Sequence, residues 1–401
     1  MKIFNDFRTI FSPNAISYFL FFIVVFLLTR QVPFFEYSSF MNIALLGFAI
    51  YPLVELVKSI LKRKEQFSAL IATSLILFLI LSIYSVAHIN EPVNILKWLI
   101  ILSVLLIAYK VSPSENFVIT FIGLIIIQAI FIDAILLLMT TSFTLDNYSV
   151  VRQYVFLKDW GDVYTFDGFF WFVKLRGSGL LPVGLFVSYL YLKGRIRIIA
   201  LIILIPSIIV SNTAFVFASV IFFTILLFIR IRLTFARVIA VLITLLLIAP
   251  LLNSVVSKVI SDKDSSMDVR YDQFNVLVND FTKSNSGILF GTGLGHTISV
   301  DSPVRDYTGD MYFELQPIYV LNQLGFVVFS LYIFIHMILA KIFIRDKELL
   351  LLYCCYVLYA SSNPYIFDTS HFVVIVVLVS LRKIIDERNL CSSSGLQPQL
   401  R

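Results

Sequence analysis

Residues 117–139 read FVITFIGLIIIQAIFIDAILLLM, a run of 23 residues in which Asp133 carries the one charged side chain. A helix of this length crosses the hydrocarbon core of a bilayer, which is roughly 30 Å thick. The whole chain has the same character, since 59% of its 401 residues are hydrophobic, 14% are charged and the mean hydropathy is +0.93. A soluble domain carries roughly 25% charged residues. The composition therefore excludes a soluble globular protein and indicates an integral membrane protein.

The apolar runs show no ten-residue alternation, which argues against an outer-membrane barrel. The predicted fold class is all-α, a polytopic bundle of about 12 transmembrane helices with two large extracytoplasmic loops. We expect the spans at residues 15–29, 40–57, 68–87, 93–109, 117–139, 178–192, 198–210, 214–229, 238–252, 317–340, 349–360 and 372–381. The resulting segments are the first five helices (1–139), a first loop (140–177), helices six to nine (178–252), a second loop (253–316), the last three helices (317–382) and a tail (383–401).

The basic residues indicate which side each loop faces. Most of the 31 Lys and Arg residues fall in the short loops that alternate with the two large ones. Because Lys and Arg are retained in cytoplasmic loops, both termini are predicted to be cytoplasmic and both large loops periplasmic, in a bacterial inner membrane. This distribution also explains the net charge of +6 without nucleic acid as a partner. The three cysteines have no metal-ligand spacing, and neither a metal nor a cofactor is expected.

The second large loop contains an arginine on a predicted amphipathic helix. Met267, Tyr271, Phe274, Leu277, Val278 and Phe281 recur at helical spacing and predict an apolar face on the membrane surface. Arg270 precedes Phe274 by four residues, so we expect it on that apolar side, where a charge needs an anionic partner. Asp272 or Asp310 could pair with it in a purely structural role, and an anionic substrate is the functional alternative.

Three alternate glycines follow this helix, in Gly291-Thr292-Gly293-Leu294-Gly295-His296. They permit positive φ angles and a close approach of backbone N–H groups to a ligand, while a tight turn between helices is the structural alternative. The segment is not a nucleotide-binding loop, since no Lys-Ser or Lys-Thr follows and no strand pattern precedes it. His296 is a candidate base or substrate contact, or a solvated loop histidine.

The end of the second loop carries acidic and aromatic residues that lead into a span. Asp310 and Tyr312 are candidate substrate contacts, and Glu314 lies at the predicted outer membrane boundary. A carboxylate there could take a proton from an incoming hydroxyl group. Stabilisation by the dipole of the following helix explains Glu314 equally well.

In the first large loop, acids alternate with aromatics. Trp160 and Tyr164 are candidates for stacking on sugars, although an interfacial aromatic belt has the same composition. Arg176 is followed by Gly177-Ser178-Gly179 and could present its guanidinium group to a phosphate. Asp133, near the outer end of its span, is a candidate partner for such an arginine.

The order Arg176-Gly-x-Gly, Arg270, Gly291-x-Gly293-x-Gly295 and then an acid eleven residues before Gly325 resembles the bacterial O-antigen polymerase and O-antigen ligase superfamily. The resemblance is architectural over nearly the whole chain and extends to motifs from about Arg176 to Gly325. It implies a membrane glycosyltransferase of the GT-C type that uses undecaprenyl-diphosphate-linked sugars without metal. Arg176 and Arg270 would neutralise the diphosphate, Glu314 would be the base, and the glycines would shape the backbone around the headgroup.

Two features distinguish polymerase from ligase in this comparison. Ligases usually have histidine at the position of Glu314, and many have Ser-Arg where this chain has Ser211-Asn212-Thr213. The resemblance therefore favours polymerisation of oligosaccharide repeat units into O-antigen, the polymer of lipopolysaccharide, or a related surface polysaccharide. The alternatives are an O-antigen ligase and a flippase, a transporter for the same lipid-linked unit. Expected partners are the undecaprenyl-linked oligosaccharide and membrane lipid, with a chain-length regulator and a flippase as candidate protein partners.

Overall fold

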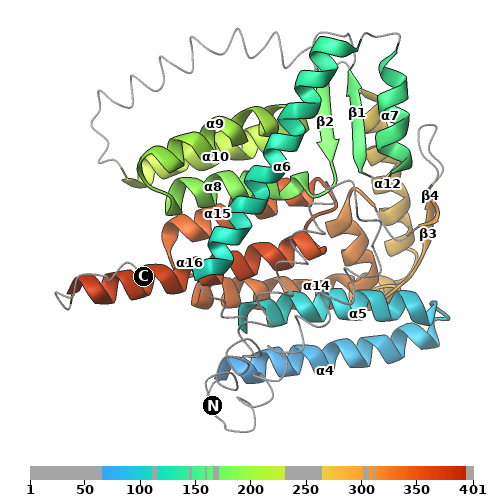
Figure 1. Cartoon of the computed structure of the whole chain (residues 1–401). Coiled ribbons are helices and arrows are strands. Elements are labelled where there is room, and N and C mark those ends of the chain that lie inside the picture. Colours follow the sequence, from blue (N-terminus) through green and yellow to red (C-terminus); the bar gives the residue numbers. More distant parts are fainter. Residues whose placement is uncertain are drawn as a thin grey trace, which may run out of the picture.

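The computed structural model describes residues 66–110, 115–143, 147–158, 160–165, 171–230, 264–300, 307–310 and 313–393. The expected spans at 15–29, 40–57 and 238–252 lie outside these residues. The helices of the bundle are α4 (Gln66–Ala87), α5 (Pro92–Ile107), α6 (Glu115–Ser142), α8 (Leu181–Tyr191), α9 (Gly194–Ser211), α10 (Thr213–Arg230), α14 (Gln316–Phe343), α15 (Lys347–Ser361) and α16 (Thr369–Ser393). Figure 1 shows them packed around one another, with the loop elements at one side.

Four of the described helices are long and apolar enough to cross a membrane, namely α6, α9, α10 and α14. Shorter apolar helices cover Ile71–Ala87, Pro92–Ile107 and Ser178–Tyr191. A mostly helical membrane protein is thereby confirmed, while the number of about 12 spans stays a prediction. On α9, Ile198, Ile202, Ile205 and Ile209 are exposed while Leu204 and Ile208 are buried, as expected of a helix with one face toward lipid.

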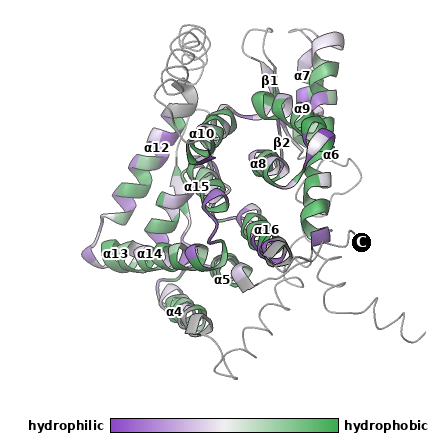
Figure 2. Ribbon diagram, turned by 90° about the vertical axis from the view of Figure 1, so that its left-hand side faces the viewer, coloured by the Kyte–Doolittle hydropathy of each residue, from purple (hydrophilic) through white to green (hydrophobic). Residues whose placement is uncertain are grey.

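Helix α16 lies at the centre of the bundle. Its residues from Phe372 to Leu378 are all at most 1% exposed, and Figure 2 shows the helix among α5, α8 and α15. The sequence predicts a short span at 372–381, but the helix extends from Thr369 to Ser393. A helix that is apolar all round is buried by its neighbours, and the polar residues after position 381 continue it beyond them.

Loops that the sequence assigns to the same side of the membrane lie at the same ends of the helices. Loops expected on the cytoplasmic side contact one another, through Arg230 with Glu348, Tyr191 with Glu115 and Arg382 with Asp346. At the opposite ends of the same helices, Asn212 after α9 donates a hydrogen bond to Asn363 after α15. Among the described residues, loop ends assigned to one side by their charge thus contact one another in pairs. Which end faces the cytoplasm stays a prediction.

The two large loops contain strands and helices beyond the one amphipathic helix that the sequence predicts. The first holds α7 (Tyr148–Leu157) and an antiparallel hairpin of β1 (Gly161–Thr165) and β2 (Trp171–Leu175). The second holds α12 (Asp264–Phe281), α13 (Asn285–Phe290) and a hairpin of β3 (Ile298–Val300) and β4 (Tyr307–Asp310). The all-α prediction therefore holds for the bundle but not for these loops. Aromatic and β-branched residues in β2 favour a strand.

Helix α12 exposes part of the apolar face that the sequence places on the membrane surface. Val269, Gln273 and Leu277 are buried, whereas Tyr271 and Phe274 are 67% and 44% exposed. The buried side thus contains Gln273 beside two apolar residues, while two aromatic side chains face outward. This arrangement suits a helix whose outer apolar residues lie in a membrane surface, because lipid replaces water as the surrounding medium.

Candidate functional site

The predicted base and one predicted arginine form an ion pair. Nε of Arg270, on the first half of α12, lies 3.0 Å from Oε2 of Glu314, two residues before α14. The side chains are 27% and 30% exposed, so both are largely shielded from water. The Arg270 Nε–H is itself buried and makes no hydrogen bond within the described chain, so it is not directed at the carboxylate. The expected anionic partner of Arg270 is therefore Glu314, in place of Asp272 or Asp310.

The hairpin β1–β2 adds polar groups through the alternation of its side chains. Tyr164 faces Phe172 and Asp162 faces Lys174 across the two strands, so these four share one face. The rings of Tyr164 and Phe172 are stacked with centroids 5.1 Å apart. The other face is formed by Val163, Thr165, Trp171, Val173 and Leu175, all buried. Burial of that apolar face fixes the hairpin and leaves Tyr164 and Lys174 on the opposite side.

Lys174 is a second cation beside the ion pair. Burial is the largest influence on the pKa of its ammonium group and would lower it. Attraction to Tyr365, Glu314 and Tyr164 outweighs this effect, so the pKa is raised, even though Arg270 opposes the protonated form. For Tyr164, burial has the opposite effect and raises the pKa of the hydroxyl group. The positive charge of Lys174 lowers that pKa and so offsets part of the rise. We refer to Arg270, Glu314, Lys174 and Tyr164 as the Arg270 site.

Arg176, the other predicted arginine, lies one residue beyond β2. Its backbone N–H donates a hydrogen bond of 2.6 Å to the carbonyl of Trp160, and its side chain is exposed. Gly177 then turns the chain with a φ of 81°. Trp160 is half-buried and meets the ring of Tyr154 edge-on at 5.5 Å. Roles of Arg176 and Trp160 in substrate binding stay predictions.

The glycine segment, residues 291–295, forms backbone hydrogen bonds next to a break in helix α14. Gly325 has φ 69° and ψ 168°, which interrupts the helix. The carbonyls of Asn322 and Gln323 accept hydrogen bonds from Thr292 N–H at 2.9 Å and Gly293 N–H at 3.1 Å. In an unbroken helix these carbonyls would bond to the next turn. The glycine segment therefore completes the hydrogen bonding of the broken helix.

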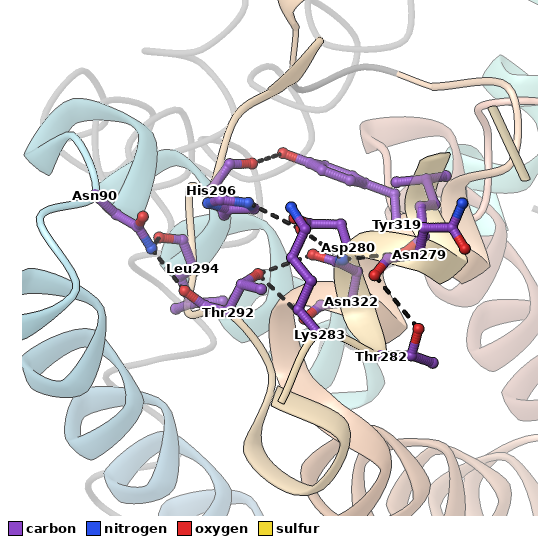
Figure 3. Close-up of polar contacts among 11 residues, drawn as sticks. Asn90, Asn279, Asp280, Thr282, Lys283, Thr292, Leu294, His296, Tyr319 and Asn322 are labelled. Atoms are coloured by element: carbon purple, nitrogen blue, oxygen red, sulfur yellow. Dashed lines mark hydrogen bonds and ion pairs between the residues drawn. The ribbon is translucent and has the colours of Figure 1, made fainter. Parts of the chain in front are cut away.

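The remaining N–H groups of the glycine segment are also used within the protein. Their acceptors are Gly287 O for Gly291, Ser85 Oγ for Leu294 and Gln323 Oε1 for Gly295. Figure 3 shows the same segment held from the other side by the Asn90 amide, which donates to the carbonyls of Thr292 and Leu294. No N–H from 291 to 295 is thus left for a phosphate. Contact of Gly291, Gly293 and Gly295 with substrate stays a prediction, but their backbone donors would not supply it.

His296 belongs to a separate cluster. Its Nε2 lies 3.0 Å from Oδ2 of Asp280, which also accepts from Asn322 Nδ2 at 3.1 Å, and Lys283 donates to Oδ1 at 2.7 Å (Figure 3). The bond from His296 is the largest influence on the Asp280 pKa, which is lowered. Ten residues of α12 separate Arg270 from Asp280, which corresponds to about 15 Å. The structure therefore does not bring His296 to the predicted base.

The other predicted residues contribute less to the described site. Asp310 is the last residue of β4, and Tyr312 lies outside the described residues. Within the described residues Asp133 forms no ion pair with an arginine, and its carboxylate accepts a hydrogen bond of 2.7 Å from Ser207 of α9. Among the residues that the structure describes, no three His, Cys, Asp or Glu side chains come together in a way that could hold a metal ion.

Lys174 is the residue of this site that the sequence analysis missed. The sequence feature that could have identified it is the segment from Trp171 to Leu175, where one charged residue interrupts the apolar residues of a strand. Period-2 alternation would have set it apart from Val173 and Leu175, on the face of Tyr164. Comparisons of the chain with family models, curated proteins and solved structures find no match, so the Arg270 site is the observation on which a functional proposal rests.

Proposed function

We propose that the chain is a membrane glycosyltransferase that polymerises undecaprenyl-diphosphate-linked oligosaccharide repeat units into O-antigen or a related surface polysaccharide. The reaction would invert the anomeric carbon and need no metal. The observation that carries the proposal is the half-buried ion pair of Arg270 and Glu314 with Lys174 beside it. Two cations and one carboxylate leave a positive charge in a place where water is limited.

That excess charge suits an anionic leaving group. Arg270 keeps a buried Nε–H that makes no hydrogen bond among the described residues, so it has a donor available for an incoming oxygen. Cations in a poorly solvated site attract an anion more strongly than they would in water. A diphosphate would therefore compete with Glu314 for Arg270, and Lys174 would add to the attraction.

The chemistry follows from this competition. When Arg270 turns to the diphosphate, Glu314 loses its partner and becomes free to accept a proton from the acceptor hydroxyl. The acceptor oxygen forms a bond to C1 as the bond from C1 to the phosphate oxygen breaks, and the proton passes to Glu314. The negative charge that develops on the diphosphate is stabilised by Arg270 and Lys174, an electrostatic effect that often contributes most to such a step. Tyr164 and Phe172 offer a stacked aromatic surface on the same side as Lys174.

The test uses matched substitutions at the two ends of the bundle. In a deletion strain complemented with Glu314→Gln or Arg270→Ala, we expect surface glycan with single repeats, a loss of roughly 100-fold or more in polymer. Glu348→Gln and Arg230→Ala remove a second described Arg–Glu pair, at the opposite end, and should leave long chains. Gel profiles of the surface polysaccharide are compared at equal amounts of membrane-inserted protein.

Three outcomes would contradict the proposal. Unchanged long-chain ladders in both Arg270→Ala and Glu314→Gln would remove the catalytic assignment. Accumulation of undecaprenyl-linked polymer in the deletion strain would indicate a ligase, because the polymer is then made but not transferred. Unextended units retained on the inner side of the membrane would indicate a flippase.

A further inference from the structure

Inside the bundle, away from the Arg270 site, two histidines and three tyrosines form a buried group. They are Tyr109 of the short 3-10 helix η1 (Ala108–Lys110), Tyr332 and His336 of α14, Tyr353 of α15 and His371 of α16. We call them the His–Tyr cluster. Each is at most 8% exposed. Ionisable groups at such a position in a membrane protein are costly and usually have a function.

The hydrogen bonds of the His–Tyr cluster allow only one arrangement of protons when both rings are neutral. His371 Nδ1 lies 2.6 Å from the carbonyl of Ile366, which can only accept, so Nδ1 carries the hydrogen. His371 Nε2 is then an acceptor, and the Tyr353 hydroxyl, 2.9 Å away, donates to it. Tyr353 has no second hydrogen to give. Its oxygen must therefore accept from Tyr109, at 3.1 Å.

The same reasoning determines the proton positions on Tyr109 and His336. Tyr109 has given its hydrogen to Tyr353, so its oxygen accepts from Nδ1 of His336, 3.3 Å away. His336 is thus protonated on Nδ1, and its Nε2 is a bare acceptor. The bonds run in one direction, from His336 through Tyr109 and Tyr353 to His371.

The bare acceptor has no partner. His336 Nε2 and the Tyr332 hydroxyl are both buried and make no hydrogen bond to any described residue. The ring centroids of His336 and Tyr332 are 4.5 Å apart, so the two side chains that carry these unpaired atoms are neighbours. A buried polar group without a partner costs roughly 1–3 kcal/mol, which is a reason to look for what it binds.

We propose that the His–Tyr cluster binds one proton at His336 and relays it to His371. A hydronium ion that reaches the cluster gives a proton to His336 Nε2, and His336 passes its Nδ1 proton to Tyr109. Tyr109 gives its own hydroxyl proton to Tyr353, and Tyr353 gives its proton to Nε2 of His371. Each oxygen loses one proton and gains one, so both tyrosines end neutral. His336 ends as the other neutral tautomer, and His371 becomes an imidazolium.

The cluster holds a single excess proton. The rings of His336 and His371 are 5.8 Å apart, so a second positive charge would be repelled by the first. The other titratable groups around the rings are the hydroxyls of Tyr332 and Tyr356 and the carboxylate of Asp368, three positions before His371. Asp368 directly precedes α16, and its carboxylate accepts hydrogen bonds from the hydroxyls of Thr369 and Ser370.

The test is nitrogen NMR on the full chain in lipid nanodiscs with ¹⁵N-labelled histidine. The chain has 4 histidines, so each ring can be assigned by substitution. At neutral pH we expect His336 and His371 both to be neutral and protonated on Nδ1. On acidification through and below the range in which histidine ordinarily titrates, about pH 5–8, His371 should become an imidazolium while His336 changes from the Nδ1–H to the Nε2–H tautomer over the same pH range.

Two variants distinguish a relay from a merely structural cluster. Tyr353→Phe interrupts the chain and should abolish the coupled change, with His371 no longer charging as His336 changes tautomer. Tyr356→Phe removes a buried hydroxyl from the same helix that bonds instead to the Tyr365 carbonyl, and should keep the coupled change. If Tyr353→Phe does not fold, Tyr109→Phe interrupts the neighbouring link.

The proposal is overturned by any of three results. The first is a tautomer other than Nδ1–H for His336 or His371 at neutral pH. The second is that the two histidines of the unmodified chain titrate independently of each other or do not titrate. The third is that the charging of His371 and the tautomer change of His336 remain coupled after the Tyr353 or Tyr109 hydroxyl is removed. None of these measurements depends on glycosyltransferase activity, so they can fail or succeed apart from it.

Discussion

Replacing Gly291 by alanine should destabilise the protein by about 2–5 kcal/mol. The residue has a φ of 78°, and a Cβ atom there would lie 2.2 Å from the Gln323 carbonyl oxygen and 2.5 Å from the Gly325 nitrogen. A non-glycine residue at positive φ costs about 1–2 kcal/mol. Overlap with well-packed surroundings adds about 1–3 kcal/mol, and here the neighbours are backbone atoms that cannot rotate away.

Two other glycines separate these contributions. Gly194 has a φ of 57° and nothing within 4 Å of an added Cβ, so Gly194→Ala should show the backbone cost alone, about 1–2 kcal/mol. Gly123 lies inside α6 with no positive φ and open space around it. Gly123→Ala should therefore stabilise the helix by up to about 1 kcal/mol. The expected order of stability is Gly123→Ala, the unmodified chain, Gly194→Ala and then Gly291→Ala.

Thermal unfolding in detergent, followed by tryptophan fluorescence, measures this order. Trp98 is a local reporter, because it packs edge-on against Tyr319, whose hydroxyl bonds to the carbonyl of His296. Membrane proteins often unfold irreversibly, so half-times at one temperature are compared as well as midpoints. Equal stability of Gly291→Ala and Gly194→Ala would refute the close approach between the glycine segment and the break in α14.

Three further predictions concern single side chains. The hydrogen bond from His296 lowers the Asp280 pKa. The charged carboxylate therefore contributes its full stability above about pH 4 and loses it as the pH falls further. The difference in melting temperature between the unmodified chain and Asp280→Asn should be largest near neutral pH and shrink below about pH 4. Lys174→Gln should reduce polymer about 10-fold or more while Lys174→Arg retains most of it, as seen on polysaccharide gels, and equal loss in both would contradict a role for charge. Asn90→Ala leaves two carbonyls without their donor and should lower stability by about 1–3 kcal/mol in the unfolding assay, with no change expected if those bonds are absent.

The bundle was predictable because lipid imposes a strong rule. Every backbone group in a bilayer must be bonded within the protein, so a long apolar run can only be a helix. Residues 117–139 accordingly lie within α6, Glu115–Ser142. The loops follow no such rule, and the β1–β2 hairpin was not expected. Five-residue strands give a weak signal beside runs of more than twenty apolar residues.

The site was predicted in part. Arg270 and Glu314 were identified as candidates, but their pairing depends on how α12 packs against the start of α14, which lie 44 positions apart in the chain. The apolar face of α12 was assigned to the membrane surface. With lipid at the surface, Tyr271 and Phe274 are exposed and Gln273 is buried. The pattern alone did not show that Leu277, which belongs to the same predicted face, is buried against the protein.

The bond between Ser85 Oγ and the Leu294 N–H joins residues 209 positions apart. Translation adds about 5–20 residues per second, so the corner between α4 and α5 would wait about 10–40 s for this partner to leave the ribosome. During that interval the polar groups of Ser85 and Asn90 need water, lipid headgroups or a chaperone for their hydrogen bonds. Slowing elongation between these two positions should lengthen the window in which a protease can cut the nascent chain near Asn90.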